Sequence, residues 1–317
     1  MKKKIIEQDA LYSEAKQLAK KYRNLNTAKM QEALNIDYPK ASKFLDMLRE
    51  EGIVNAERIP NKANLNKLYK DKDWKEFENK PVIPLGAETA THNLVGNLMN
   101  DFNLIITGQA GSGKSTFFHC AMANLLKNTK ASELQFVLID SEKNEFSLYE
   151  SLPNLALPVV KTPKEAKTAF EWCLKEIEAR SKLLKGKNAP MTIEDYNTKH
   201  ENKIPRIVII IDECSDLMVD DLDFFKKAIL EILKFSHSTS VNILMATSKL
   251  SQTKIYPKEL IDAFGFRIAF KTTTSADSEA IFGVPGAEDL QGKGDMLLMY
   301  PYDQELTRLQ GFYISEK

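Results

Sequence analysis

Apolar residues in the first sixty positions recur at helical spacing. They predict one helix at residues 11–22, a second at residues 27–34 and a third at residues 38–51, ended by the glycine that follows. Three short helices followed by Gly-Ile-Val are the outline of a winged helix-turn-helix. The apolar positions alone fit any small helical bundle equally well. We therefore assign residues 1–60 to a small, mainly α domain.

The pattern changes beyond this domain. Residues 61–80 are polar and rich in Asn, Lys and Asp, which predicts a linker. In residues 81–317, short β-branched runs alternate with helical stretches, which predicts an α/β domain with a mostly parallel sheet covered on both faces. Residues 185–204 are expected to form an exposed insertion. The candidate buried strands are Leu104–Ile106, Phe136–Ile139, Ile207–Ile211, Val241–Met245 and Arg267–Phe270.

Composition narrows the class of protein. The chain has 317 residues, of which 43% are hydrophobic, so it can bury a substantial core and suits two domains. The longest aliphatic run, Ile207–Ile211, is too short to span a bilayer, and no signal-peptide pattern follows the basic amino terminus. Three widely spaced cysteines predict neither a structural metal nor a disulfide framework. We expect a cytoplasmic protein.

The charges are unevenly divided, although the formal net charge is zero. Residues 1–80 carry 18 Lys and Arg against 13 Asp and Glu, and residues 81–317 carry 26 against 31. The amino-terminal part is therefore the more favourable place for contact with a polyanion.

A phosphate-binding loop is predicted between the first candidate strand and a helix. Its glycines allow backbone amides to face phosphates, and the helix amino terminus adds positive potential. Lys114 is expected to bridge the β- and γ-phosphates of ATP, and the Ser115 hydroxyl to help hold Mg²⁺. A glycine-rich turn without function is the weaker interpretation, because strand, loop and helix follow in the required order. The predicted nucleotide-binding residues are Gly108, Gln109, Ala110, Gly111, Ser112, Gly113, Lys114, Ser115 and Thr116.

Two carboxylates follow the aliphatic strand at residues 207–211. Ligands bind at the carboxyl ends of strands in open α/β sheets, so Asp212 is expected to hold Mg²⁺ and Glu213 to activate the attacking water. Two solvated acids after a core strand are the alternative. Ser248, at the end of the next strand, is expected to sense the γ-phosphate, or else to be an ordinary loop serine.

Further short motifs follow one another across residues 81–317. In this order they resemble the FtsK/SpoIIIE family, and the last two make the resemblance specific. It implies a RecA-like P-loop NTPase that hydrolyses ATP, moves double-stranded DNA and assembles into a ring, expected to be a hexamer. The motifs are Leu85-Gly86 with Asn93–Val95, Phe136–Asp140 with Leu148–Pro153, Trp172–Arg180, Asp212–Met218 (D-E-x-x-D-L-M), Gly286–Leu290 and Gly292–Leu297 (G-x-G-D-M-L).

The basic amino-terminal part resembles the small winged-helix DNA-reading domain of the same family. That domain usually follows the motor, whereas here it precedes it. The resemblance makes Lys40, Lys43 and Arg49 on the third helix candidate DNA contacts. A helical adaptor that binds protein is the alternative.

The chain also departs from the family pattern. His237 stands where the family has an arginine thought to reach the neighbouring subunit's nucleotide, which puts in doubt how subunits coordinate hydrolysis. Arg267 could supply such a charge at a subunit boundary, or be a surface charge at a strand start. We expect a stand-alone DNA translocase, such as those of mobile elements. A protein-translocating ATPase and an ATP-switched DNA-binding or replication accessory module are the two alternatives.

Overall fold

The predicted apolar runs form neighbouring strands of one sheet. The computed structural model describes residues 10–21, 27–36, 38–51, 53, 62–88, 93–140, 145–186, 189–218, 221–248, 250–252, 254–301 and 305–314. Its strands are β1 Ala63–Asn64, β2 Val82–Ala87, β3 Asn93–Asn97, β4 Leu104–Thr107, β5 Leu134–Asp140, β6 Arg206–Asp212, β7 Val241–Thr247, β8 Phe266–Phe270, β9 Asp295–Met299, β10 Leu306–Gln310 and β11 Phe312–Tyr313.

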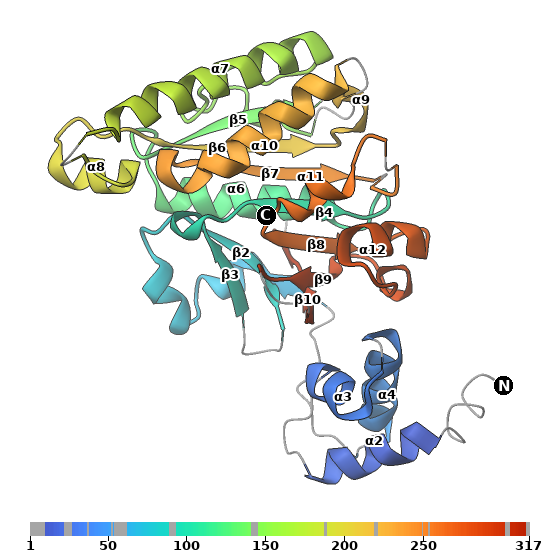
Figure 1. The fold of residues 1–317 in the computed structure, drawn as a ribbon. Helices are drawn as coiled ribbons and strands as arrows, with labels where there is room; N and C mark the ends of the chain where they lie inside the picture. Colours follow the sequence, from blue (N-terminus) through green and yellow to red (C-terminus); the bar gives the residue numbers. More distant parts are fainter. Residues whose placement is uncertain are drawn as a thin grey trace.

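Helices cover this sheet and form the separate amino-terminal unit (Figure 1). The longest, α7, begins after Thr162, whose hydroxyl accepts a hydrogen bond from the Glu165 amide while the Glu165 carboxylate accepts one from the Thr162 amide. The helices are α2 Ala10–Lys21, α3 Thr27–Leu34, α4 Tyr38–Glu50, α5 Leu65–Leu68, α6 Lys114–Asn128, α7 Pro163–Leu183, α8 Ile193–Lys199, α9 Ser215–Met218, α10 Leu222–Thr239, α11 Lys258–Asp262 and α12 Ser275–Phe282, with short 3-10 turns at η1 Asp73–Phe77, η2 Leu98–Asn100, η3 Ser147–Tyr149 and η4 Ala287–Asp289.

The sheet has a parallel centre and an antiparallel extension. Its order in the described residues is β3-β2-β10-β9-β8-β4-β7-β6-β5. The five strands from β8 to β5 pair in parallel, and Thr107 of β4 pairs with Thr247 of β7. The predicted α/β fold with a largely parallel sheet is therefore confirmed. The antiparallel strands β9, β10, β2 and β3 were not predicted as strands.

The side chains of the central strands point alternately to the two faces of the sheet, which explains why helices cover both faces. Ile207, Ile209 and Ile211 of β6 pack in the core under α7 and α10, whereas Val208 and Ile210 pack in the core under α6. Side chains of a strand point to opposite faces in turn, so an uninterrupted aliphatic run serves both cores. Each such side chain contributes about 1.5–3 kcal/mol through burial.

Residues 61–80 were assigned to a linker from their polarity, but residues 62–80 fold against the α/β domain instead. β1 pairs in parallel with β11 near the end of the chain. Leu65, Leu68 and Trp74 are buried in a cluster that includes Cys120 of α6. The prediction failed because these few apolar residues are widely spaced among Asn, Lys and Asp, and their partners lie far away in sequence.

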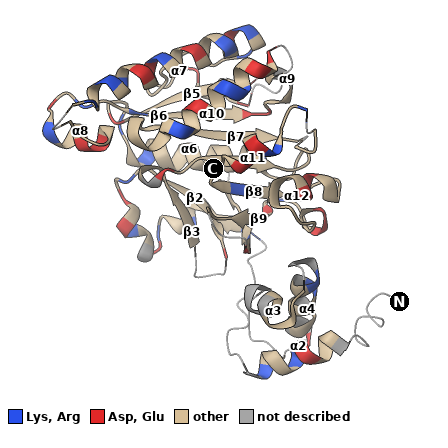
Figure 2. Ribbon diagram, viewed as in Figure 1, with Lys and Arg blue, Asp and Glu red and all other residues tan. Residues whose placement is uncertain are grey.

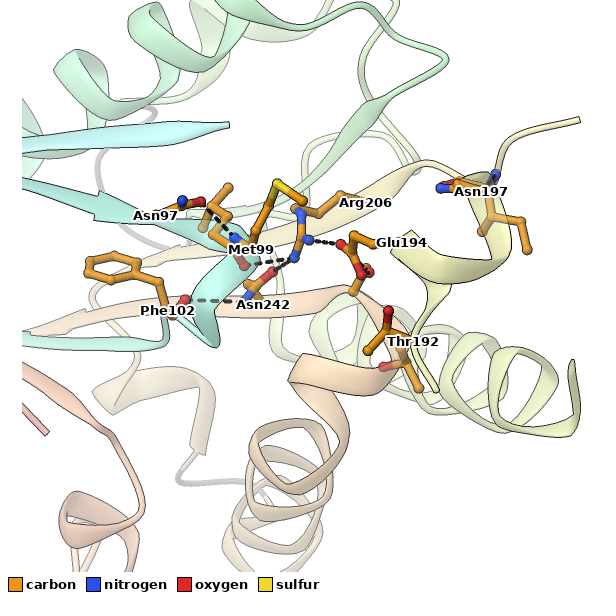
Figure 3. A network of polar contacts seen from close by, with 12 residues as sticks. Asn97, Met99, Phe102, Thr192, Glu194, Asn197, Arg206 and Asn242 are labelled. Atoms are coloured by element: carbon orange, nitrogen blue, oxygen red, sulfur yellow. Dashed lines mark hydrogen bonds and ion pairs between the residues drawn. The ribbon is translucent and has the colours of Figure 1, made fainter. Parts of the chain in front are cut away.

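The expected exposed insertion at 185–204 is partly wrong as well. α8 lies within it, and Ile193 is fully buried. Glu194 forms an ion pair with Arg206 at the start of β6 (Figure 3). It also accepts a hydrogen bond from Ser240 over 2.6 Å. Arg206 also donates to Asn242 over 2.6 Å. This buried network fixes α8 at the amino-terminal edge of the sheet.

The helices α2, α3 and α4 occur where the sequence predicted them. They enclose a small core in which the rings of Tyr12 and Phe44 lie 5.1 Å apart. The Tyr12 hydroxyl donates to Glu51 over 3.0 Å and joins α2 to the end of α4. Residues 54–61, where a wing would follow, lie outside the described residues, so the winged-helix assignment stays a prediction.

Candidate nucleotide-binding site

The phosphate-binding loop connects β4 to α6 at the carboxyl edge of the sheet. Gly113 precedes the helix with φ of 129°, a region that favours glycine, and a Cβ there would lie 3.1 Å from Gly294. A cavity of about 500 Å³ opens beside the loop, lined in part by Gly111, Gly113, Lys114, Ser115 and Thr116. The predicted loop therefore borders a space of the size used by small-molecule ligands.

Buried polar groups at the loop fit a phosphate ligand. The Lys114 ammonium donates to the carbonyl oxygens of Gly108 over 2.6 Å and Gln109 over 3.2 Å. The hydroxyls of Thr107 and Ser112 are buried and have no hydrogen-bond partner in the described part of the chain. Because unpartnered buried hydroxyls are costly, such groups indicate a place where a ligand supplies the missing contacts.

The loop and the acidic strand end meet at Ser115 and Asp212. Ser115 Oγ donates to Asp212 Oδ2 over 2.8 Å, and Asp212 is almost fully buried. A hydroxyl and a carboxylate placed together are the oxygen ligands that Mg²⁺ uses alongside nucleotide phosphates. These two residues therefore fit the predicted magnesium site.

Glu213 lies next to this pair with its carboxylate enclosed by hydroxyl groups. Oε1 accepts hydrogen bonds from Ser215 Oγ over 2.7 Å and Thr247 Oγ1 over 2.9 Å, and Oε2 accepts from Ser248 Oγ over 2.6 Å. Burial acts to raise the pKa of Glu213, but the hydrogen bonds from Ser248, Ser215 and Thr247 outweigh it and lower this pKa. Glu213 is thus held as a carboxylate.

A turn near the carboxyl end of the chain packs onto the phosphate loop. The Gly294 amide donates to the Ser112 carbonyl over 2.9 Å, and the Gly311 amide donates to the Gly294 carbonyl over 2.7 Å. Arg308 fixes the neighbouring Asp295 through two hydrogen bonds of 2.9 and 2.8 Å. The G-x-G-D-M-L motif that marks the family resemblance is therefore part of the site, a placement that the sequence did not predict.

The sequence analysis also missed the outer wall of the cavity. His119, one helical turn beyond Ser115, accepts or donates a hydrogen bond with the Tyr149 hydroxyl at 2.8 Å. The position of His119 on the predicted helix could have suggested it. Lys293 also lines the cavity and belongs to the G-x-G-D-M-L motif. The remaining residues of the wall come from distant segments and carried no such signal; they are Lys62, Glu145, Gln310, Phe312 and Tyr313.

Other predicted residues lie apart from the loop. Arg267 pairs with Ile105 in the sheet and forms an ion pair of 3.2 Å with Asp262. His237 is exposed in the last turn of α10, before β7, and thus at the opposite edge of the sheet. Within one chain, neither is brought to the Lys114 and Asp212 pair.

The three candidate DNA contacts lie on α4 of the amino-terminal unit. Lys43 is exposed, and the Lys40 ammonium lies 5.5 Å from the centre of the Phe44 ring. Arg49 belongs to the same helix, but its side chain lies outside the described residues. Their role stays a prediction.

Comparison with known proteins shows which family the chain resembles. Residues 64–204, which contain the phosphate loop, match the FtsK/SpoIIIE family. Over these residues the chain is similar to the domain that defines this family. The chain is 33% identical over 269 residues to the DNA translocase FtsK of Borreliella burgdorferi and 31% identical over 282 residues to that of Chlamydia pneumoniae. The alignments cover 82% and 84% of this chain and 34% of each relative, so the chain spans about a third of their length.

Solved structures share the fold of the α/β domain. One is the pCW3 conjugation coupling protein TcpA, in its monomer form with ATPγS, which aligns with a TM-score of 0.69 at 24% sequence identity. The alignment covers 83% of this chain and 72% of TcpA. Another is the cytoplasmic domain of the Thermomonospora curvata type VII secretion ATPase EccC, which also aligns with a TM-score of 0.69, at 20% sequence identity. The alignment covers 81% of this chain and 33% of the EccC chain. At these identities the likeness establishes the P-loop ATPase fold.

Two features concern membrane and metal binding. No helix in the described ranges is long and apolar enough to cross a membrane. The same residues hold no group of three or more His, Cys, Asp or Glu side chains that could bind a metal ion. Cys120, Cys173 and Cys214 are buried free thiols.

Proposed function

We propose that the protein is an ATPase that moves along double-stranded DNA as a ring, in the manner of an FtsK/SpoIIIE motor. The observation that carries this proposal is the contact of Ser115, which lies within the residues that match the FtsK/SpoIIIE family, with Asp212 at the end of β6. This contact joins the phosphate loop to the carboxyl end of β6, and both would bind the same metal ion. The curated relatives from Borreliella burgdorferi and Chlamydia pneumoniae are DNA translocases, which supports DNA as the substrate.

Each residue of the site would have a distinct role in ATP hydrolysis. The amides of residues 108–115 and the Lys114 ammonium bind the phosphates, once Lys114 leaves the carbonyls it contacts in this structure. Ser115 and Asp212 would hold Mg²⁺, which would neutralise part of the phosphate charge. Glu213 orients and deprotonates the attacking water, and its ionised state suits a base. Ser248 contacts Glu213 and so links γ-phosphate sensing to the base.

The ring, expected to be a hexamer, would place each nucleotide between two subunits. Arg267 would then approach a neighbour's nucleotide, because inside its own chain it lies away from the loop. DNA would pass through the centre and be gripped by its phosphates, with little dependence on sequence. Positive and negative side chains alternate along α7 and α10 (Figure 2), so their outer face is a poor candidate for the DNA path.

The amino-terminal unit would add a DNA contact through α4. Lys43 is exposed on this helix, and residues 1–80 carry the excess of basic charge. Lysines contact phosphates more than base edges, so this unit would position the motor on DNA. In this proposal residues 1–60 fold as a winged helix.

ATP turnover with and without duplex DNA tests the proposal. At low salt, duplex DNA should raise kcat several-fold for the wild type, while Glu213→Gln should show almost no turnover in either condition. Turnover that ignores duplex DNA but rises with a protein substrate would favour the protein-translocating alternative, whose fold the secretion ATPase shares. DNA binding that needs ATP but persists in Glu213→Gln without any movement would favour the accessory module.

A further inference from the structure

The two oxygens of the Glu213 carboxylate have different surroundings. Oε1 is bonded by the hydroxyls of Ser215 and Thr247, which are 2% and 0% exposed. Oε2 is bonded by Ser248, through its amide at 2.8 Å and its hydroxyl at 2.6 Å, and Ser248 is partly exposed. Oε1 is therefore held within the fold, and Oε2 lies on the side that faces outward.

The backbone of Glu213 makes these side-chain bonds important. Its φ of 63° is left-handed, a conformation that costs a non-glycine residue roughly 1–2 kcal/mol. Such a conformation persists where surrounding contacts offset its cost. The hydrogen bond from Ser215, two residues further on, offsets part of the cost and fixes the direction of the carboxylate.

A buried tyrosine lies behind Ser215. The Tyr256 hydroxyl is 3.1 Å from Ser215 Oγ and 3.1 Å from Cys214 Sγ, and the residue is 1% exposed. Ser215 has one hydroxyl hydrogen, which it donates to Glu213, so its oxygen is the acceptor for Tyr256. Burial raises the pKa of Tyr256, so the phenol keeps its hydrogen. The three residues form a directed chain from Tyr256 through Ser215 to Glu213. A further hydrogen bond joins Tyr256 to Thr247, the second hydroxyl on Oε1 of Glu213.

We propose that Ser215, oriented by Tyr256, is a positioning residue that aims the Glu213 carboxylate in ATP hydrolysis. This inference rests on the proposed ATPase function. Ser215 occupies an unspecified position of D-E-x-x-D-L-M, and Tyr256 lies outside all of the family motifs. Neither residue lines the cavity at the phosphate loop. Their effect therefore falls on the hydrolytic step and leaves nucleotide binding unchanged.

Steady-state kinetics and nucleotide affinity test this role together. Removal of one hydrogen bond to a charged group should lower kcat of Ser215→Ala roughly five- to tenfold. KM for ATP and the Kd of a non-hydrolysable analogue should stay at the wild-type values. Tyr256→Phe removes one oxygen, keeps the ring, and should lower kcat less. The matched control is Ser236→Ala, which removes an equally buried hydroxyl from the other end of the sheet, near Asn103.

The double variant separates positioning from general damage. Because Tyr256 bonds Ser215 as well as Thr247, Ser215→Ala/Tyr256→Phe should lower kcat by less than the product of the two single effects. In the nucleotide-free protein, a cycle of Ser215→Ala and Glu213→Gln should show coupled effects on urea unfolding. The inference is wrong if the kinetic effects of the two substitutions multiply, or if Ser215→Ala keeps full kcat while Glu213→Gln abolishes it. Wild-type kcat in Glu213→Gln would instead overturn the proposed function itself.

Discussion

Ser115 Oγ donates a hydrogen bond to Asp212 Oδ2 over 2.8 Å, although 97 residues separate the two along the chain. Ser115 lies in the first turn of α6 and Asp212 ends β6, and β7 lies between β4 and β6 in the sheet. The parallel register brings both strand ends to the same edge. This contact brings together the residue proposed to follow the phosphates and the residue proposed to hold the metal ion.

Lys114→Ala should abolish ATP binding while the fold is retained. The ammonium is nearly buried and has no nearby substitute on the loop, so its removal takes away the charge that offsets the phosphates. We expect the Kd for a fluorescent ATP analogue to rise at least about tenfold, equivalent to roughly 1.4 kcal/mol. The control is Lys127→Ala, at the far end of α6. An unchanged Kd would remove Lys114 from the site.

Asp212→Asn tests the magnesium assignment. The amide keeps the size of the side chain but lacks the negative charge that favours a divalent cation. We expect Mg²⁺ to strengthen ATP binding to the wild type and to have little effect on the variant, with similar affinities once EDTA is present. Calorimetric titration with and without Mg²⁺ measures this difference. Equal Mg²⁺ dependence in both proteins would contradict the assignment.

Gly294→Ala should destabilise the motor through the packing of the carboxyl-terminal turn. Gly294 has φ of 92°, and a Cβ there would lie 2.6 Å from Nε2 of Gln310. We expect a decrease of about 1–3 kcal/mol in the free energy of unfolding, together with weaker nucleotide binding. Gly283→Ala is the matched control, because Gly283 has φ of 78° with no atom within 4 Å of the added Cβ. Equal decreases in the two variants would exclude a contribution from the steric clash.

Deletion of residues 1–60 tests the amino-terminal unit. If α4 contacts DNA phosphates, the truncated protein should bind duplex DNA more weakly and with a smaller dependence on salt. The slope of log K against log salt should fall by about 0.9 for each DNA phosphate that the deleted unit had neutralised. Lys43→Ala in the full chain should reproduce part of this change. An identical slope in the truncated protein would favour the protein-binding adaptor.

Sequence predicted the centre of the fold and of the site, because both depend on local patterns. A few consecutive residues are enough to predict a buried strand at residues 207–211 and a phosphate-binding loop from its glycines. Contacts between distant segments were missed. The hydrogen bond from Gly294 to Ser112 and the pairing of β1 with β11 join residues that are far apart in the sequence. Of the hydroxyl groups around Glu213, Ser248 was predicted as a site residue. Ser215 and Thr247 were missed for the same reason, since they meet through the register of β6 and β7.

Movement along DNA is the central claim, and displacement of a third strand from a DNA triplex measures it directly. We predict that the wild-type protein, given ATP and Mg²⁺, displaces a third strand placed at a distance from the loading end, and that Lys114→Ala and Glu213→Gln do not. Wild-type protein that hydrolyses ATP in the presence of the duplex yet leaves the triplex intact would contradict the account.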